Sequence, residues 1–268
     1  MTAAAARSRT DIGIGGITVR VHSSSAAFLQ LLDERYAGFI ERGASPDYEF
    51  GVELTPPGEG TADDDVRVYR RNGRWQLERG DFRAEWDPAA RRGRIRQSAN
   101  PYSIDTVLRI VHTLVLAREG GFLLHAASAV RNGSAFVFAG ASGAGKTTLS
   151  RLAPADAGVL SDEISYVRRE ENGYYAYGTP FAGELARVGE NLRAPLQAVY
   201  LLAQGAENRV SNMGKAEAAR GILANILFFA EDAELVQAVF LSALDLVERV
   251  PVRRLTFRPD AAIWELIR

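Results

Sequence analysis

The apolar residues of the first hundred positions follow two different periods. An apolar run at 14–21 predicts a strand, and apolar positions then recur at helical spacing over 28–40. Alternation with a period of two, typical of strands, follows in four short runs, at 48–54, 66–70, 75–78 and 82–86. The second and third of these runs flank Asn72-Gly73, a pair that favours a tight hairpin. The pattern predicts a strand, a helix and an antiparallel sheet.

The pattern changes near residue 100. Apolar side chains at i, i+3, i+4 and i+7 spacing over 102–118 predict an amphipathic helix. Runs on either side of Asn132-Gly133 predict a second hairpin. The later runs predict strands at 198–202 and 250–257 and helices at 215–229 and 232–248. We therefore expect an N-terminal antiparallel α+β lobe over residues 1–100 and an α/β domain over residues 101–268.

A glycine-rich segment after the second hairpin matches the phosphate-binding pattern G-x-x-x-x-G-K-[ST]. The segment and the residue after it are Gly140, Ala141, Ser142, Gly143, Ala144, Gly145, Lys146, Thr147 and Thr148. Triphosphate oxygens need many donors at once, and the backbone N–H groups of such a loop can point inward to supply them. Lys146 then reaches the β- and γ-phosphates, and the Thr147 hydroxyl binds Mg²⁺. ATP and Mg²⁺ are the ligands that the segment predicts.

Charge and composition limit the classes of partner and the cellular compartment that we expect for this protein. The 268 residues carry a formal net charge of -1, which gives no global attraction to nucleic acid or to an anionic membrane. Without cysteine the chain has no disulfides, thiolate metal sites or cysteine nucleophiles. Residues 1–9 lack the apolar stretch of a secretory signal, and 106–117 is too short to cross a bilayer. We expect a cytoplasmic protein with neither nucleic acid nor membrane as a partner.

Three features in this order resemble the HPr kinase/phosphorylase family. His125 precedes the glycine-rich loop, and Ser161-Asp162-Glu163 follows it, at that family's approximate spacing. The chain's length is similar to that of compact members found beside genes for modified peptides such as lasso peptides. The resemblance implies an α/β P-loop core of the HPr kinase/phosphoenolpyruvate carboxykinase-like type in the second domain. Because HPr kinases assemble as oligomers, it leaves a homo-oligomer open.

The resemblance also implies roles for individual residues. Asp162 takes the proton of the acceptor hydroxyl, although a carboxylate at a strand end can instead hold Mg²⁺. Glu163 stands where the family usually has aspartate and is a Mg²⁺ candidate, the alternative being a glutamate that faces solvent. His125 supports the γ-phosphate or holds the nearby carboxylate, the alternative being a histidine with only a structural role. Independently of the resemblance, the guanidinium of Arg187 could steady phosphate oxygens or a substrate carboxylate, the alternative being a plain surface arginine.

The expected function is an ATP-dependent kinase that transfers the γ-phosphoryl group to a serine of a small protein or peptide. Two alternatives remain open, a small-metabolite kinase and a non-catalytic ATP-dependent peptide-binding module. Separately, a basic cluster in the first lobe could grip an acidic partner, although such a cluster on an exposed hairpin usually forms only a solvated face. The cluster consists of Arg91, Arg92, Arg94 and Arg96.

Overall fold

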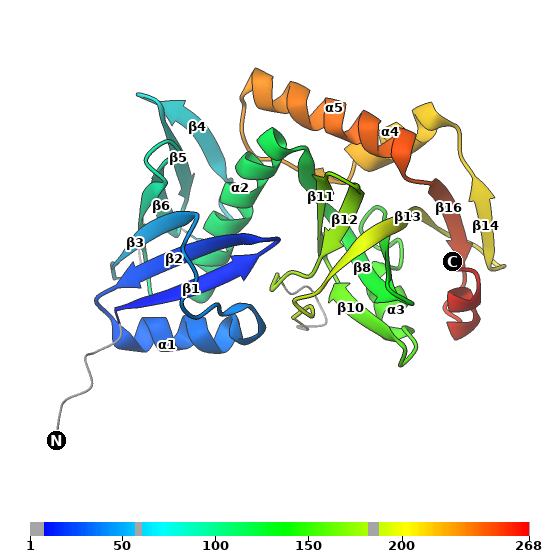
Figure 1. Ribbon diagram of the computed structural model, residues 1–268, viewed down its shortest axis with the longest axis horizontal. Helices are drawn as coiled ribbons and strands as arrows, with labels where there is room; N and C mark the ends of the chain where they lie inside the picture. Colours follow the sequence, from blue (N-terminus) through cyan, green and yellow to red (C-terminus); the bar gives the residue numbers. More distant parts are fainter. Residues whose placement is uncertain (1–7, 57–60, 182–187, 268) are drawn as a thin grey trace. The chain divides into compact units, whose positions relative to one another are not determined.

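The chain folds into two compact units, shown as a ribbon in Figure 1. The computed structural model describes residues 8–56, 61–181 and 188–267. The first unit spans Met1–His112 together with Phe229–Asp232, and the second spans Thr113–Phe228 together with Ala233–Arg268. The division falls inside helix α2 (Pro101–Glu119) instead of at residue 100. The start of α2 belongs to the first unit because Ser103 hydrogen-bonds to Asp81 there.

The first unit is built on a seven-stranded sheet with the order β1-β2-β3-β7-β6-β5-β4. The strands are β1 (Arg9–Ile14), β2 (Ile17–Ser23), β3 (Tyr48–Leu54), β4 (Arg67–Arg71), β5 (Arg74–Arg79), β6 (Phe82–Asp87) and β7 (Arg92–Gln97). The sheet is mixed and not antiparallel throughout, since β2 pairs with β3 and β3 with β7 in parallel. Helix α1 (Ala26–Arg35) and the short helix η1 (Ala37–Phe39) lie in the crossover that makes β2 and β3 parallel.

Both predicted hairpins are confirmed. Asn72 and Gly73 have φ of 51° and 78° between β4 and β5. Asn132 and Gly133 have φ of 52° and 76° between β8 (Gly121–Arg131) and β9 (Ser134–Ala139). Positive φ at both central residues is what a two-residue hairpin turn requires, and Asn-Gly reaches it at the lowest steric cost.

The second unit is built on a nine-stranded sheet. Besides β8 and β9 it contains β10 (Ala157–Ser161), β11 (Ile164–Glu170), β12 (Gly173–Tyr177), β13 (Arg193–Gln204), β14 (Arg209–Asn212), β15 (Ile226–Leu227) and β16 (Val252–Phe257). Strand β13 pairs in parallel with β9 on one edge and with β16 on the other. The remaining pairs are antiparallel, including those of β8 with β9, β10, β11 and β15. Strand β8 therefore has partners along both of its edges.

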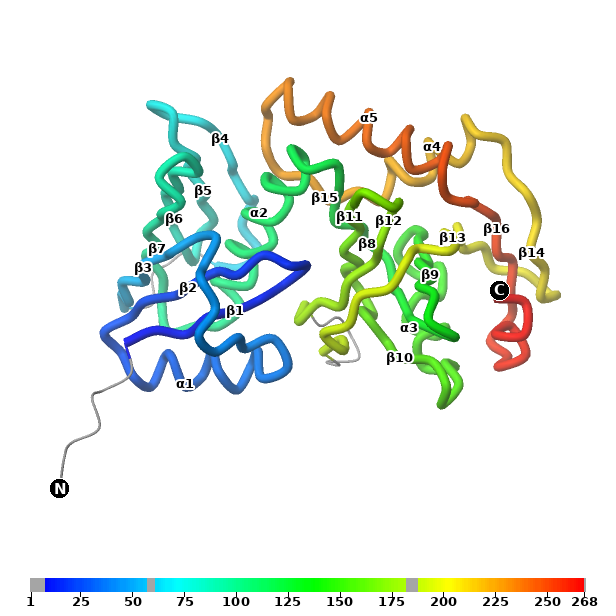
Figure 2. The backbone as a smooth tube through the Cα atoms, in the orientation of Figure 1, coloured from blue at the N-terminus to red at the C-terminus, as the bar shows by residue number. Residues whose placement is uncertain are grey.

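Helices cover both faces of this sheet, as the tube in Figure 2 lets the reader follow. Val137 of β9 packs in a core with residues of α4 (Lys215–Leu223) and α5 (Ala233–Arg249). Phe136 and Phe138 pack in a second core with α3 (Lys146–Arg151) and the short helix η2 (Ala261–Glu265). Successive strand residues point to opposite faces, so a strand buried on both sides reads as one apolar run. No helix in the described part of the chain is long and apolar enough to cross a membrane.

Candidate functional site

The glycine-rich loop connects the end of β9 to the start of α3. Gly143 and Gly145 have φ of +79° and +106°, a region that residues with a side chain rarely adopt. A Cβ at Gly145 would lie 2.6 Å from Cζ of Phe257, and one at Gly140 would lie 2.9 Å from Cβ of Ala144. Backbone conformation therefore favours glycine at 143, lack of space favours it at 140, and both constraints act at 145.

Lys146 folds back over the first residues of the loop. Its Nζ donates hydrogen bonds to the carbonyl oxygens of Gly140, at 2.8 Å, and Ala141, at 3.2 Å. The residue is 7% exposed. Gln204, the last residue of β13, holds the other side of the loop, because its Nε2 donates to the carbonyl oxygen of Gly143 at 2.8 Å. The loop is thus fixed from both ends.

Strand β8 brings the predicted site segments to one level of the sheet. Ala126 pairs with Ala139, the last residue before the loop. On the opposite edge of β8, the amide of Ala126 donates to the carbonyl oxygen of Glu163 at 2.8 Å, and His125 pairs with Ile164. Neighbouring strands lie about 4.8 Å apart, so the backbones of the loop's start and of the acidic turn are separated by roughly 10 Å across β8.

His125 shares the sheet face of α3. Leu124 and Ala126 belong to the α4–α5 core and Ala127 to the α3 core, so strand alternation places His125 with Ala127. Burial lowers the pKa of His125 below its ordinary value of 6.5, and the positive charge of Lys146 lowers it further. The imidazole is therefore neutral at pH 7 and lies within electrostatic reach of the loop lysine.

The acidic turn between β10 and β11 is held by its own serine and by a buried threonine. Oγ of Ser161 accepts from the amides of Glu163, at 3.2 Å, and Ile164, at 2.9 Å. Oγ1 of Thr179 donates to the carbonyl oxygen of Ile164 at 2.9 Å, and Thr179 is fully buried. Asp162 is 3% exposed, whereas Glu163 is half-buried. The turn is rigid, and its two carboxylates differ in access to solvent.

Two residues that fix this site carried no signal in the sequence analysis. Gln204 reaches Gly143 only because β13 runs parallel to β9, with Leu201 opposite Ala139. Thr179 lies in a glycine- and proline-containing loop whose sequence says nothing about its contact with Ile164. Neither contact can be predicted from the spacing of residues along the chain.

Comparison with known proteins assigns the family. The sequence model of the family described as SynChlorMet cassette protein ScmC matches residues 96–268, more than half of the chain. The chain belongs to this ScmC family. No curated protein matches the sequence.

Membership of the ScmC family corrects the expected HPr kinase/phosphorylase relationship, which was wrong. The resemblance rested on His125, the loop and an acidic pair. Such short motifs describe the chemistry of holding phosphate and do not define a family. The similarity to compact family members found beside genes for lasso peptides rested on the chain's length, and it was wrong as well.

The residues of the loop region fit a nucleotide with Mg²⁺. The described residues contain no group of three or more histidine, aspartate or glutamate side chains that could hold a metal ion. A Mg²⁺ that binds with a nucleotide instead takes most ligands from phosphates and water and only one or two from protein carboxylates or hydroxyls. Thr147, Asp162 and Glu163 could supply these. Thr148 follows in the first turn of α3, and Arg187 lies outside the described residues.

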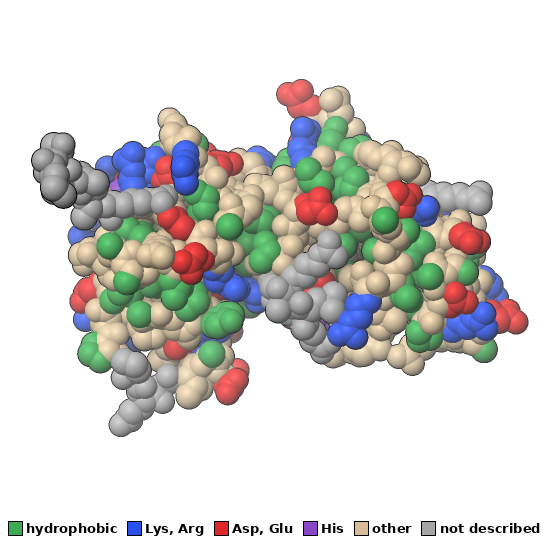
Figure 3. Space-filling model, turned by 90° about the horizontal axis from the view of Figure 1, so that it is seen from below, with side chains coloured by type: hydrophobic (Ala, Val, Ile, Leu, Met, Phe, Trp, Pro, Cys, Tyr) green, Lys and Arg blue, Asp and Glu red, His purple; other side chains and the backbone are tan. Residues whose placement is uncertain are grey.

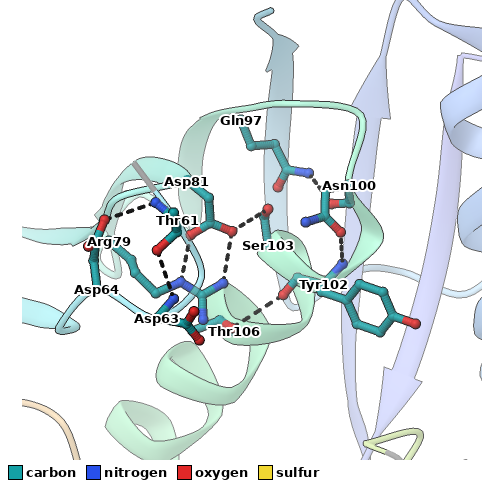
Figure 4. Close-up of polar contacts among 10 residues, drawn as sticks. All are labelled: Thr61, Asp63, Asp64, Arg79, Asp81, Gln97, Asn100, Tyr102, Ser103 and Thr106. Carbon is teal, nitrogen blue, oxygen red and sulfur yellow. Dashed lines mark hydrogen bonds and ion pairs between the residues drawn. The ribbon is translucent and has the colours of Figure 1, made fainter. Parts of the chain in front are cut away.

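A second polar cluster, in the first unit, is drawn in Figure 4. Asp81 accepts hydrogen bonds from Arg79 at 2.6 Å and from Ser103 at 2.7 Å. Burial raises the pKa of Asp81, but these hydrogen bonds outweigh burial and hold the pKa below its usual value. Nearby, Asp64 accepts from the amide of Thr61 at 2.9 Å. The Ser103 contact ties the β5–β6 turn to α2, and the Thr61 contact closes a turn within the loop before β4, so we interpret the cluster as structural.

Proposed function

We propose that the second unit binds ATP with Mg²⁺ and transfers the γ-phosphoryl group to a hydroxyl, with the serine of a small protein or peptide as acceptor. The observation that carries the proposal is the loop at 140–147, in which Lys146 lies over the loop's first carbonyl groups. Two further points support the proposal. The sequence of the loop follows a phosphate-binding pattern, and His125 and the acidic turn lie at the same level of β8 as the start of the loop.

The proposed division of labour follows from the donors and acceptors present. Lys146 and the loop amides hold the phosphates. Neutral His125 donates one hydrogen bond to a γ-phosphate oxygen. Mg²⁺ would be held by Thr147 and Glu163 and would neutralise phosphate charge. The acceptor oxygen forms a bond to the γ-phosphorus while the bond to the β-phosphate bridging oxygen breaks. The hydroxyl proton passes to Asp162, and ADP leaves with the electron pair.

The test separates nucleotide binding from transfer. The purified protein is titrated with a fluorescent ATP analogue and then incubated with Mg²⁺, γ-labelled ATP and serine-containing peptides, small proteins or free serine. Lys146→Ala should lose both binding and transfer. Asp162→Asn should keep binding and lose transfer by about a hundredfold or more, the usual contribution of a general base.

Matched controls remove the same charges elsewhere in the second unit. Lys215 and Asp156 are exposed and pair with Glu248 and Arg131. Lys215→Ala and Asp156→Asn should bind and transfer like the wild-type protein. Failure of the wild-type protein to bind ATP, or unchanged binding by Lys146→Ala, would refute the proposal. Loss of Mg²⁺-dependent ATP binding in Asp162→Asn would assign Asp162 to the metal and not to the proton.

A second candidate is a non-catalytic ATP-dependent peptide-binding module. The low exposure of Asp162, 3%, favours it, because a general base must contact the acceptor hydroxyl. Tight ATP binding without transfer to any of the three acceptor classes, combined with ATP-dependent peptide binding, would support this candidate. Transfer to free serine alone would instead support a small-metabolite kinase.

A further inference from the structure

The seven-stranded sheet of the first unit has one apolar face and one charged face. Phe50, Val52 and Ile95 are buried on the apolar face. The intervening positions of β3 and β7 form the charged face, which we call the outer face, and they are Glu49, Gly51, Glu53, Arg92, Arg94 and Arg96. Two hollows of about 640 and 900 Å³ lie on this face. Both are lined by His22, Gly51 and Arg94, so they adjoin and form one groove, the β3–β7 groove.

A glycine opens the groove. Gly51 is exposed and pairs with His22 of β2 on one side and with Arg94 of β7 on the other. A Cβ at Gly51 would have nothing within 4 Å. Every other position in that row carries a side chain, so the missing one leaves a hollow between the imidazole and the guanidinium. Each hollow has the size of a pocket for a ligand or for a few side chains.

The carboxylates beside the groove already have basic partners. Glu85 and Asp87 pair with Arg74, at 2.7 and 3.6 Å. Glu53 pairs with Arg96 at 3.2 Å, and Glu49 contacts His22 at 3.3 Å. Arginine pairing therefore offsets the charge of Glu53 and part of the charge of Glu85 and Asp87, whereas the charge of Glu49 is offset only when His22 is protonated.

Arg92 and Arg94 are the two arginines of the groove that have not yet been assigned a partner. Both side chains are exposed, and neither side chain makes a hydrogen bond or ion pair with any residue in the described ranges, although the charge of Arg94 helps to lower the pKa of Glu85. Acidic and basic side chains are interspersed over the face of the molecule drawn in Figure 3. Of the predicted basic cluster, Arg96 is paired and Arg91 lies in the turn before β7. The groove thus presents two guanidinium groups that form no ion pair, although Asp87 and Glu85 of β6 stand opposite them in the sheet register.

The spacing of these two arginines selects an extended partner. Arg92 and Arg94 are two residues apart on one strand, so their Cα atoms are roughly 6.7 Å apart and their side chains share a face. An extended peptide repeats its same-side residues at that distance. A guanidinium binds a carboxylate through two parallel hydrogen bonds. We infer that the β3–β7 groove binds an extended acidic peptide segment, whose alternate carboxylates pair with Arg92 and Arg94 and whose backbone passes over Gly51.

The test uses a fluorescein-labelled octapeptide with glutamate and serine in alternation, followed by anisotropy without ATP, so its outcome is independent of the proposed kinase activity. The variant Arg92→Gln/Arg94→Gln should weaken binding about tenfold or more, since two charge-assisted contacts are lost. Gly51→Leu fills the groove without changing charge and should weaken binding to a similar extent. Circular dichroism checks that each variant folds, and Gly51→Ser serves as a smaller substitution if leucine does not fold.

The control variant Arg67→Gln/Arg71→Gln removes the same charge from β4 of the same sheet. It should bind like the wild-type protein. The inference is overturned if the wild-type protein does not bind the peptide, or if the control weakens binding as much as the groove variants, which would mean unspecific attraction. It is also overturned if inorganic phosphate competes as well as unlabelled peptide, which would indicate a simple anion site.

Discussion

Replacement of Gly145 by alanine tests whether the loop before α3 is as constrained as its geometry indicates. Gly145 combines a φ of +106° with close approach to Phe257, whose ring is buried. The left-handed backbone costs a residue with a Cβ about 1–2 kcal/mol. The contact at 2.6 Å from Cζ forces the ring or the loop to move, and such overpacking costs about 1–3 kcal/mol. Gly145→Ala should therefore destabilise the second unit by about 2–5 kcal/mol.

The matched control is Gly133→Ala, in the hairpin turn between β8 and β9. Gly133 has a φ of +76°, yet a Cβ there would have nothing within 4 Å. This variant carries the backbone cost alone, about 1–2 kcal/mol. Urea unfolding followed by circular dichroism gives both free energies, and hydrogen exchange of the β9–α3 peptides shows where each loss lies. Nucleotide titration should show weaker binding for Gly145→Ala, whereas Gly133→Ala should bind nucleotide like the wild-type protein.

The double variant Gly145→Ala/Phe257→Leu isolates the clash, because leucine lacks the outer atoms of the ring. Relative to Phe257→Leu alone, the alanine should then cost only the backbone term of about 1–2 kcal/mol. Equal unfolding free energies for Gly145→Ala and Gly133→Ala, with no loss of exchange protection around the loop, would refute the reasoning from geometry.

Three further predictions concern single contacts. Asp105→Asn should destabilise the first unit by about 3 kcal/mol in thermal or urea unfolding. Buried Asp105 accepts hydrogen bonds from Arg35 and Tyr36, and the change removes the counter-charge of the arginine. The pKa of His125 is lower in the folded protein than in the unfolded chain, so the unfolded chain binds more protons and stability should fall as the pH falls from 6.5 through the folded pKa. Proton NMR should show the pKa of His125 rising in the Lys146→Gln variant. An unchanged pKa would contradict the coupling between the two residues. Gln204→Ala removes one neutral hydrogen bond to the loop, worth about 1 kcal/mol, and should weaken nucleotide binding about fivefold, whereas unchanged affinity would mean that the loop keeps its shape without it.

Much of the secondary structure could be read from the sequence, although not always its pairing. The helix expected over 102–118 matches α2, because its apolar spacing is local and strong. The helix expected over 215–229 ends earlier, at Leu223, and Ile226 and Leu227 instead pair with β8 as β15. An apolar run cannot distinguish the end of a helix from a short buried strand, since both bury the same side chains.

Features that depend only on neighbours along the chain can be read from the sequence. The Asn-Gly turns and the positive φ of Gly143 and Gly145 follow from local backbone sterics, whereas the contact of Gly145 with Phe257 joins residues far apart in the chain. The folded structure alone sets the parallel pairings of β3 and β13, the approach of His125 to Lys146 and the hydrogen bond of Gln204 to Gly143. It also decided that Gly51 opens a groove between two strands. These contacts join residues far apart in the chain, and strand order is set by burial of whole faces, which no local pattern encodes.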